Sequence, residues 1–235
     1  NEVVDIPDPG YFFSGSHQGV GAMVRNEEGH PVGSFYGYRI LGLFNSQDEV
    51  DNAPTQTAAA PGRFRYDDIN NDGAIDAEDR THLGDPNPDL TYGINLNLGY
   101  GNFDLSAFLF GSRGNEIFNL TESYMHFMGF YPTTNVSRDL LNAWTPDNTD
   151  TNIPVVESQG GFSTTSVPNS FYIENGSFLK LRSLSLGYTV PAALLQKFRI
   201  SNLRLYVQGE NLFTLTKYSG LDPEIIGGST SALGI

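Results

Sequence analysis

The stretch LTYGINLNLGY, Leu90–Tyr100, decides the fold class of this chain. Apolar or aromatic side chains alternate in it with small or polar ones. The apolar set is Leu90, Tyr92, Ile94, Leu96, Leu98 and Tyr100, and the other set is Thr91, Gly93, Asn95, Asn97 and Gly99. Because successive side chains of a strand point to opposite faces, this pattern predicts a strand with one apolar face and one polar face.

A hairpin follows directly from this strand. The dipeptide Gly101-Asn102 is a two-residue turn signal, and the segment FDLSAFLF comes after it. The second segment repeats the alternation, with four residues on one face: Phe103, Leu105, Ala107 and Leu109. The sequence therefore predicts two antiparallel strands that present matching apolar faces.

Further strands are expected elsewhere in the chain. They cover residues 34–44, residues 171–190 and residues 202–216, and a weaker one covers about residues 17–26. In the segment 202–216, Leu203, Leu205 and Val207 oppose Arg204, Gln208 and Glu210. The expected fold class is all-β and antiparallel.

Composition excludes several classes of protein. The 235 residues include 27 acidic and 13 basic ones, and the net charge of −14 argues against a nucleic-acid partner, which needs a basic face. The absence of cysteine excludes a disulfide scaffold and thiol chemistry. No apolar run is long enough for a transmembrane helix, and the polar start NEVVDIPDPG has no signal-peptide pattern.

The connections between the expected strands alternate in length. Residues 26–32, 101–102 and 191–201 are short, whereas residues 45–89, residues 112–170 and the segment from Lys217 are long. Short turns at one end and long loops at the other are typical of a transmembrane β-barrel, with outer-membrane lipid against its apolar face. Aromatic residues could form its interfacial girdles: Tyr36, Tyr38, Tyr92, Tyr100, Phe103, Tyr188 and Tyr206.

About six strands are too few to close such a barrel, because the smallest have about eight. We therefore expect this chain to be a fragment of a larger barrel. The alternative is a soluble calcium-binding β-sandwich that acts as a carbohydrate-binding or adhesion module. The two differ in whether the apolar faces are covered by protein.

An acidic loop, DDINNDGAIDAED, occupies residues 67–79. Counted from Asp68, it places oxygen donors at positions one, three, five, seven, nine and twelve, with Gly73 at six, where an EF-hand-like loop turns sharply. The expected ligands are Asp68, Asn70, Asp72, the carbonyl of Ala74, Asp76 (directly or through water) and Asp79. The ion expected is Ca²⁺, with Mg²⁺ as second choice, and Ile75 should point away into apolar surroundings. A polar turn without an ion is the alternative.

No catalytic constellation is recognisable, so we expect no enzyme. The histidines, His17, His30, His82 and His126, are scattered without ligand spacing and are interpreted as surface residues. Residues 122–144 are rich in Tyr, Phe and Met and contain the only Trp. We favour packing of this loop on itself over contact with a sugar or peptide.

Several long motifs now carry a family resemblance. GSFYGYRILGLFNSQDEVDN, DDINNDGAIDAEDRTHLGDPNPDLTYGINLNLGY, FDLSAFLFGSRGNEIFN and GENLFTLTKYSGLDPEI follow one another in this order. They resemble the C-terminal part of the barrel of SusC/RagA-family TonB-dependent outer-membrane transporters. The resemblance runs from about residue 33 to about residue 226.

The resemblance implies a plugged barrel of about 22 strands in the outer membrane of a Gram-negative bacterium. It implies import of oligosaccharides or peptides, a SusD-like surface lipoprotein as a lid, and energy from TonB. Residues 1–235 would be a C-terminal portion of the barrel, with the plug domain, which TonB would contact, and the last strand not in this chain. The long loops would then be extracellular, and the acidic loop would lie on the side of the lid.

Overall fold

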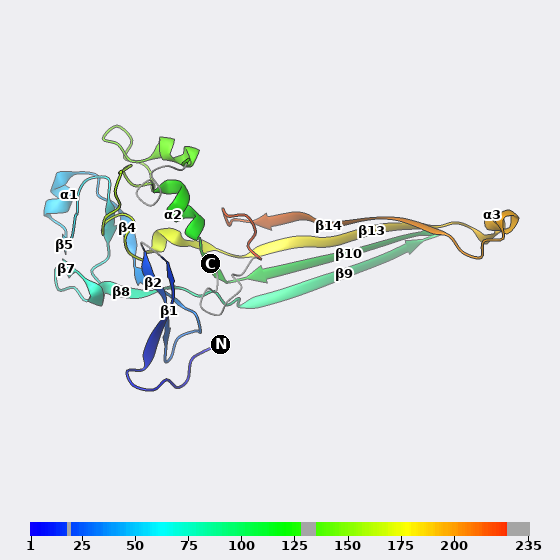
Figure 1. The fold of residues 1–235 in the computed structure, drawn as a ribbon, viewed down its shortest axis with the longest axis horizontal. Coiled ribbons are helices and arrows are strands. Elements are labelled where there is room, and N and C mark those ends of the chain that lie inside the picture. The colour runs from blue at the N-terminus through cyan, green and yellow to red at the C-terminus, as the bar shows by residue number, and fades with distance from the viewer. Residues whose placement is uncertain (18–19, 128–134, 225–235) are drawn as a thin grey trace. The chain divides into compact units, whose positions relative to one another are not determined.

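The computed structural model describes residues 1–17, 20–127 and 135–224, and the chain divides into two compact units (Figure 1). The larger unit consists of Asn1–Asn87, Glu116–Asn175 and Ser219–Ile235. The smaller unit consists of Pro88–Asn115 and Gly176–Tyr218. Each unit is therefore built from segments that are distant in sequence.

The smaller unit is one antiparallel four-stranded sheet with the order β14-β13-β10-β9. Its strands are β9 (Leu90–Tyr100), β10 (Phe103–Arg113), β13 (Phe178–Thr189) and β14 (Arg204–Thr216). In Figure 1 they run side by side over their whole length. The predicted hairpin is confirmed as β9 and β10, and the predicted strand 202–216 is confirmed as β14.

The register places apolar residues opposite apolar residues across all four strands. Leu98, Leu105, Leu186 and Val207 form one such row. The adjacent row of the other face contains Asn97, Ser106, Ser185 and Gln208. Because directly paired residues share a face, the sheet has one apolar and one polar side, as the alternation predicted.

A β-bulge in β13 keeps the apolar and polar residues on their separate faces. Strict alternation along β13 would place Arg182 on the apolar face. The register shifts between Leu181 and Ser183, so Leu181 pairs with Leu109 and with Phe213 on the apolar face. Arg182 is the extra residue, and its guanidinium carbon lies 4.1 Å from the centroid of the Phe110 ring on the polar face. An inserted residue thus keeps a cation off the apolar face.

The turn between β9 and β10 has the chemistry that its length demands. Tyr100 pairs with Phe103, so Gly101 and Asn102 form a two-residue loop. Gly101 has a φ of +57°, which the first central residue of a type II′ turn requires and which glycine adopts without steric cost.

The larger unit is built from short strands and loops. A sheet with the order β1-β2-β3-β8 contains β1 (Tyr11–His17), β2 (Gly21–Glu27), β3 (Phe35–Tyr38) and β8 (Arg80–Gly84). Three strand pairs accompany it: β4 (Ile40–Leu43) with β6 (Phe64–Tyr66), β5 (Thr55–Gln56) with β7 (Ala74–Ile75), and β11 (Glu116–Phe118) with β12 (Ile173–Asn175).

The helices of the chain are short. The α-helices are α1 (Gln47–Asp51) and α2 (Leu120–His126) in the larger unit and α3 (Ala192–Leu195) in the smaller one. The 3-10 helices are η1 (Ala77–Asp79), η2 (Arg138–Asn142), η3 (Ser170–Tyr172) and η4 (Gln196–Phe198). Over the described ranges, none of the helices is long and apolar enough to cross a membrane.

Three strand predictions were wrong in their bounds. Residues 34–44 form two strands, since β3 pairs with β8 and β4 pairs with β6 in another sheet. Residues 171–190 contain η3, β12 and β13 in succession, and β12 and β13 pair with different strands. The weak strand expected over residues 17–26 corresponds to β2, and its partner β1 was not predicted.

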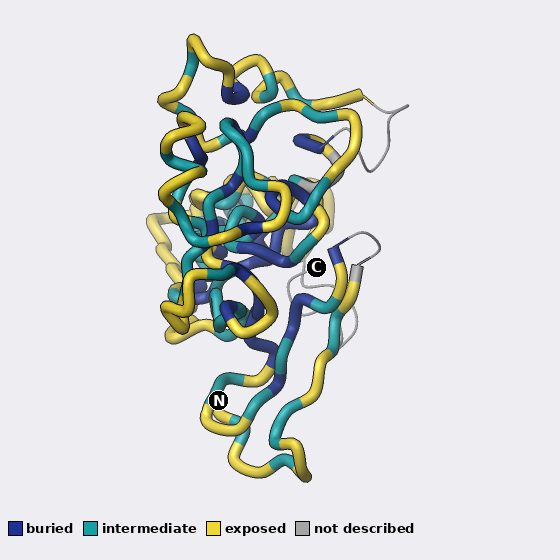
Figure 2. Tube along the Cα trace, turned by 90° about the vertical axis from the view of Figure 1, so that its left-hand side faces the viewer, coloured by how far each residue is buried: buried dark blue, intermediate teal, exposed yellow. Residues whose placement is uncertain are grey.

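Aromatic side chains form the core of the larger unit. Figure 2 shows its buried segments gathered centrally, with exposed loops around them. Phe64, Tyr66 and Tyr172 are at most 1% exposed, and the hydroxyl of Tyr66 donates to the Phe162 carbonyl at 2.8 Å. Phe127 and Trp144 also belong to this core, which agrees with packing as the role of residues 122–144 in their described part.

The residues predicted to form aromatic girdles occupy two kinds of position. Tyr36 and Tyr38 are buried in the larger unit, and Tyr206 pairs with Gly187 on the polar face, so these three cannot face lipid. The others lie at the two ends of the apolar face. Tyr100, Phe103 and Tyr188 share the row nearest the β9–β10 turn, and Tyr92 lies at the opposite end.

The tight approach of Gly37 to the backbone allows a stability prediction. A Cβ on Gly37 would lie 2.2 Å from the Pro168 carbonyl oxygen, which also accepts a hydrogen bond from the Tyr38 N–H at 2.9 Å. Gly37→Ala should therefore destabilise the larger unit by about 1–3 kcal/mol, measured by thermal unfolding and protease resistance. Gly99→Ala, whose Cβ would meet its nearest atom at 4.0 Å, is the control. Equal melting of the two variants would contradict the prediction.

Candidate functional site

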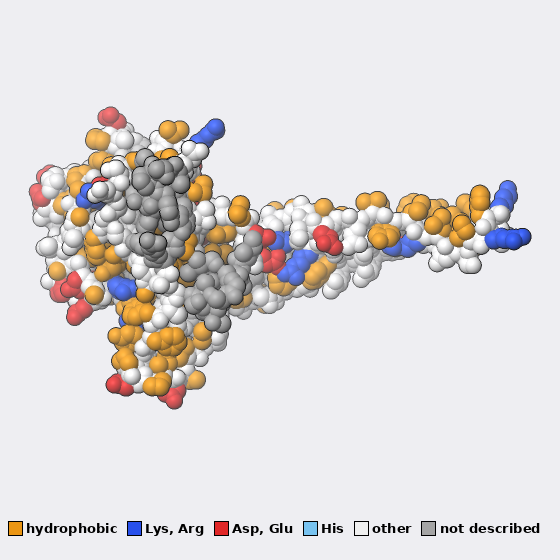
Figure 3. All heavy atoms as spheres, in the orientation of Figure 1, with side chains coloured by type: hydrophobic (Ala, Val, Ile, Leu, Met, Phe, Trp, Pro, Cys, Tyr) orange, Lys and Arg blue, Asp and Glu red, His pale blue; other side chains and the backbone are white. Residues whose placement is uncertain are grey.

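The apolar face of the smaller unit is exposed to an extent that is unusual for a protein surrounded by water. Figure 3 shows hydrophobic side chains at the surface along these strands. Ile94 is 54% exposed, Leu98 54% and Val207 76%. Soluble monomers rarely expose contiguous apolar patches larger than a few hundred Å². An exposed face of this kind favours contact with another apolar surface or medium.

The polar face of the same sheet has the opposite chemistry. Asn97 of β9 shares a row with Ser106, Ser185 and Gln208, and Asn95 shares another row with Phe108, Ser183 and Glu210. Near the β9–β10 turn the polar face contains an ion pair, in which Arg204 Nε donates to Asp104 Oδ1 at 3.0 Å. This face can be in contact with water or with polar ligands.

The acidic loop adopts the turn that its spacing predicts. Gly73, at position six, has a φ of +87°. Ile75, at position eight, is 5% exposed and belongs to the core of the larger unit. The Thr55 N–H donates to the Gly73 carbonyl at 2.8 Å, and β5 pairs with β7. The loop is thus anchored by its apolar residue and by backbone hydrogen bonds.

The side chains of the first two expected ligands, Asp68 and Asn70, both point to the backbone N–H of the third, Asp72. The Asp72 N–H lies 3.2 Å from Asp68 Oδ1 and 3.0 Å from Asn70 Oδ1. The second oxygen of Asp68 accepts from the Gly73 N–H at 2.9 Å. Asp72 Oδ1 in turn accepts from the Ala74 N–H at 2.8 Å. Positions one, three and five therefore line one turn of the loop.

Asp79, at the buried end of the loop, joins its two ends through hydrogen bonds. It is 0% exposed, and its two oxygens accept from the backbone N–H groups of Ile69 and Asp76, each at 2.8 Å. Asp76 caps η1 in return, by accepting from the Glu78 N–H at 2.8 Å. The twelfth position is therefore a structural residue, and each of its oxygens retains a second lone pair.

The expected ligand atoms of the loop are all oxygens, which a hard cation such as Ca²⁺ prefers, but the carboxylates are not yet close enough to share one ion. Within the described ranges, Asp68, Asp72, Asp76 and Asp79 form no ion pair with Lys, Arg or His, and Arg39 pairs with Asp67 outside the ligand positions. In the same part of the chain, no three of these carboxylates approach within 4.8 Å of one another. Binding would have to bring them closer.

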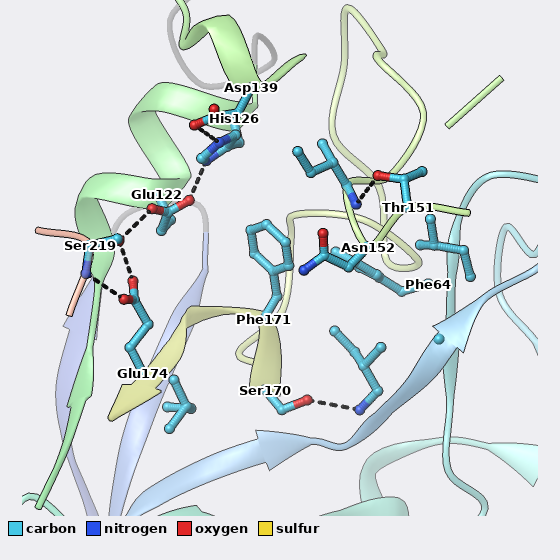
Figure 4. Close-up of a pocket in the computed structure, with 15 residues that line it drawn as sticks. Phe64, Glu122, His126, Asp139, Thr151, Asn152, Ser170, Phe171, Glu174 and Ser219 are labelled. Atoms are coloured by element: carbon cyan, nitrogen blue, oxygen red, sulfur yellow. Dashed lines mark hydrogen bonds and ion pairs between the residues drawn. The ribbon is translucent and has the colours of Figure 1, made fainter. Parts of the chain in front are cut away.

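The larger unit also contains a cavity of about 560 Å³ (Figure 4). Phe64 and Phe171 supply aromatic surface, and Glu122 and Glu174 supply carboxylates. Ser219 Oγ lies 2.7 Å from Glu174 Oε1 and 3.2 Å from Glu122 Oε1. The cavity is therefore acidic on one side and apolar on the other.

His126 at this cavity is held between two carboxylates. It is 8% exposed; its Nδ1 contacts Glu122, and its Nε2 lies 3.4 Å from Asp139 Oδ2. The hydrogen bond with Glu122 raises the pKa of His126 above its ordinary value. Since both ring nitrogens face carboxylates, the imidazole is not free to act as a general base.

The interpretation of the histidines as surface residues was wrong for three of them. His126 is buried, and His30 and His82 are half-buried and stack on each other beside Glu27. Sequence spacing could not reveal these contacts, because Glu27 and His82 are 55 residues apart. The side chain of His17 lies outside the described residues.

Comparison with known proteins identifies the family. No protein-family model matches the chain. TonB-dependent receptor P3 of Formosa agariphila is 36% identical over 234 residues, which is 95% of this chain. TonB-dependent receptor SusC of Bacteroides thetaiotaomicron is 28% identical over 165 residues, which is 68% of this chain. The chain belongs to the TonB-dependent receptor family. It covers 22% of the P3 receptor and 15% of SusC.

Solved structures agree on the fold of this TonB-dependent receptor segment. The RagAB peptide transporter matches 94% of the chain with a TM-score of 0.72 at 24% identity. The RagAB peptide importer in the open-open state matches 99% of it with a TM-score of 0.71. The chain covers 23% of each of these chains.

The environment of His126 predicts a pH dependence. Because the folded state raises the pKa of His126, the stabilisation is complete below the unfolded value of about 6.5 and is lost as pH rises through the folded pKa. The contact between α2 and η2, which includes the Ser137 N–H donating to the Met125 carbonyl at 2.9 Å, should therefore loosen. Hydrogen exchange in residues 137–142, corrected for its intrinsic pH dependence, should accelerate as the pH rises through the raised pKa of His126.

Two variants control this measurement. His126→Gln should make the exchange rate insensitive to pH over this range, and Asp139→Asn should reduce the sensitivity. A wild-type profile identical to that of His126→Gln would contradict the prediction.

Proposed function

We propose that this chain forms part of the wall and loops of an outer-membrane β-barrel in a Gram-negative bacterium. The whole protein would import oligosaccharides or peptides, with energy from TonB and with a SusD-like surface lipoprotein as partner. The single observation that carries the proposal is the uncovered apolar face of the smaller unit, opposite a polar face, in a member of the TonB-dependent receptor family.

The faces of the sheet suit a barrel wall. Lipid would contact the rows that contain Leu96, Leu98 and Leu186, and the water-filled lumen would contact Asn95 and Asn97. Strands of 11 to 13 residues match the length that a tilted strand needs to cross a bilayer. The aromatic residues at both ends of the apolar face suit the two interfaces.

A soluble sandwich, the alternative function, would cover this apolar face with a second sheet. The smaller unit, as far as the structure describes it, consists of one sheet only. The sheet also has two edges, β9 and β14. Lipid cannot satisfy the backbone groups of an edge, so further strands from the rest of the protein would pair there and close the barrel.

The partners follow from the family. Solved relatives include a RagAB peptide importer in a closed-closed as well as an open-open state. For the present protein we propose that the larger unit contains extracellular loops that meet the SusD-like lipoprotein. TonB would contact a plug region outside this chain. Import of this kind requires no catalytic residues, and the proposed function is not enzymatic.

We further propose that the acidic loop binds one Ca²⁺, with Mg²⁺ as second choice. Asp68, Asn70, Asp72, the Ala74 carbonyl, Asp76 and Asp79 would hold it. All donors are oxygens, and the irregular donor arrangement of a loop suits the longer and less strictly arranged bonds of Ca²⁺. Its chemistry is charge neutralisation, because carboxylates drawn together around one point repel one another unless a cation lies between them. The role would be to fix the loop that the lipoprotein meets.

The orientation of the sheet is tested by a matched pair of substitutions. Leu96→Arg places a cation on the apolar face near its centre and should cost about 2–4 kcal/mol if it faces lipid. Asn97→Arg places the same cation on the polar face and should leave folding intact. The measurement is urea unfolding of the full-length protein carrying this sequence, reconstituted in lipid vesicles. Greater damage from Asn97→Arg would reverse the assignment of the two faces.

Calcium binding is tested with Asp72→Ala and, as control, Asp67→Ala, an acidic neighbour outside the ligand positions. Ca²⁺ at a hundred times its dissociation constant should stabilise the loop of the wild type and of the control by about 2.7 kcal/mol against local opening. Asp72→Ala should lose most of this gain, with the barrel still folded. Hydrogen exchange in residues 67–79 with and without Ca²⁺ provides the readout. Identical protection in both conditions for the wild type would rule out the site.

A further inference from the structure

Three potential metal ligands meet on one face of the sheet β1-β2-β3-β8. Glu27 is the last residue of β2, His30 lies in the connection between β2 and β3, and His82 lies in β8. Among the described residues, this is the one group of three His, Asp or Glu side chains whose ligand atoms all lie within 4.8 Å of one another. All three side chains are half-buried.

The distances within the group are close to those of a metal site. Glu27 Oε2 and His82 Nε2 are 3.0 Å apart. Two ligands of a tetrahedral zinc ion, with bonds of about 2.0–2.1 Å, lie roughly 3.3 Å apart. The rings of His30 and His82 are stacked, with centroids at 3.6 Å and planes 13° apart. The two rings must therefore leave this stacked arrangement for all three ligand atoms to converge on one ion.

Neighbouring side chains already orient two of the three ligands. Arg25 donates to the other oxygen of Glu27, Oε1, at 2.7 Å, which leaves Oε2 facing His82. Tyr36 packs edge-on against the His82 ring at 5.3 Å and accepts from Arg25 at 2.7 Å. Outer contacts that fix a carboxylate and an imidazole in this way are typical of metal sites.

His82 also retains unused bonding capacity. Its Nδ1 is buried and has no hydrogen-bond partner within the described part of the protein. If Nε2 carries the proton and donates to Glu27, the Nδ1 lone pair is left buried. If Nδ1 carries the proton, the Nε2 lone pair faces a carboxylate oxygen with nothing positive between them. A cation between Nε2 and Glu27 Oε2 would remove the unfavourable contact of the second arrangement, in which Nδ1 carries the proton.

We propose that Glu27, His30 and His82 bind a single divalent transition-metal ion of the zinc class. Imidazole nitrogens favour zinc, copper or nickel over calcium and magnesium, so this site is chemically distinct from the acidic loop. Three protein ligands leave a fourth position for water or for a donor from another molecule. The positive charge of Arg25 sets the affinity below that of a four-ligand structural zinc site.

The bound ion would join the β2–β3 connection to β8. Val3 and His30 share a backbone hydrogen bond of 2.9 Å, so the ion would also hold the N-terminal segment against the sheet. The inference depends neither on transport nor on calcium binding.

The test uses the full-length protein carrying this sequence, purified in detergent and freed of metal with a chelator. Titration with Co²⁺ should produce the visible absorption of a low-symmetry, imidazole-ligated site, and Zn²⁺ should displace it. His30→Ala should remove one equivalent of bound ion or weaken its binding by at least about 100-fold, more than the loss of an outer-shell contact. His82→Ala and Glu27→Gln should do the same.

Matched controls keep the outcome decisive. Glu28→Gln alters the exposed neighbour of Glu27 and should retain the ion, and Asp72→Ala should retain it while affecting calcium. His30 lies in a connection between strands, so His30→Ala should melt as the wild type does without metal, which separates ligation from folding. Equal Zn²⁺ stoichiometry and affinity in the wild type, His30→Ala and His82→Ala would overturn the proposal.

Discussion

The antiparallel register of β9, β10, β13 and β14 is the constraint on which the rest of the structure depends. Backbone hydrogen bonds fix which residues face each other, and a slip of one residue would exchange the two faces of a strand. In this register Leu98, Leu105, Leu186 and Val207 form one row, and the polar residues form another. The bulge at Arg182 preserves the same division where alternation alone would have placed a cation among leucines. Lipid and water can therefore meet opposite faces of one sheet.

Sequence alone predicted this sheet because its signal is local and repeated. The alternation in Leu90–Tyr100 continues after Gly101-Asn102, and the turn dipeptide confirms the direction of the second strand. The short strands of the larger unit could not be predicted in this way. Residues 34–44 read as one apolar strand, but Tyr38 pairs with Arg80 and Leu43 pairs with Phe64. Such pairings are decided by tertiary contacts between distant segments, which propensity and period do not contain.

The candidate sites show the same difference between features set by local sequence and features set by tertiary contacts. The turn of the acidic loop was predictable, because Gly73 and Ile75 act within a few residues of the ligands and the spacing carries the geometry. The structural role of Asp79 was not, since its burial depends on the packing of the whole unit. The group of Glu27, His30 and His82 was beyond reach of the sequence, because β3 lies between β2 and β8 in the sheet and brings the first and last of these residues together.

Opposite burial patterns in the two units are averaged out in the overall composition of this chain. The larger unit follows the rules of a protein in water and buries Phe64, Tyr66 and Tyr172 completely or nearly so. The smaller unit exposes its leucines along one face and keeps asparagine, serine and glutamine on the other. Averaged together, these opposite patterns give a mean hydropathy of −0.28, which is unremarkable. The position of an apolar side chain within the register, and not its frequency in the chain, therefore decides whether it lies on the apolar face of the sheet.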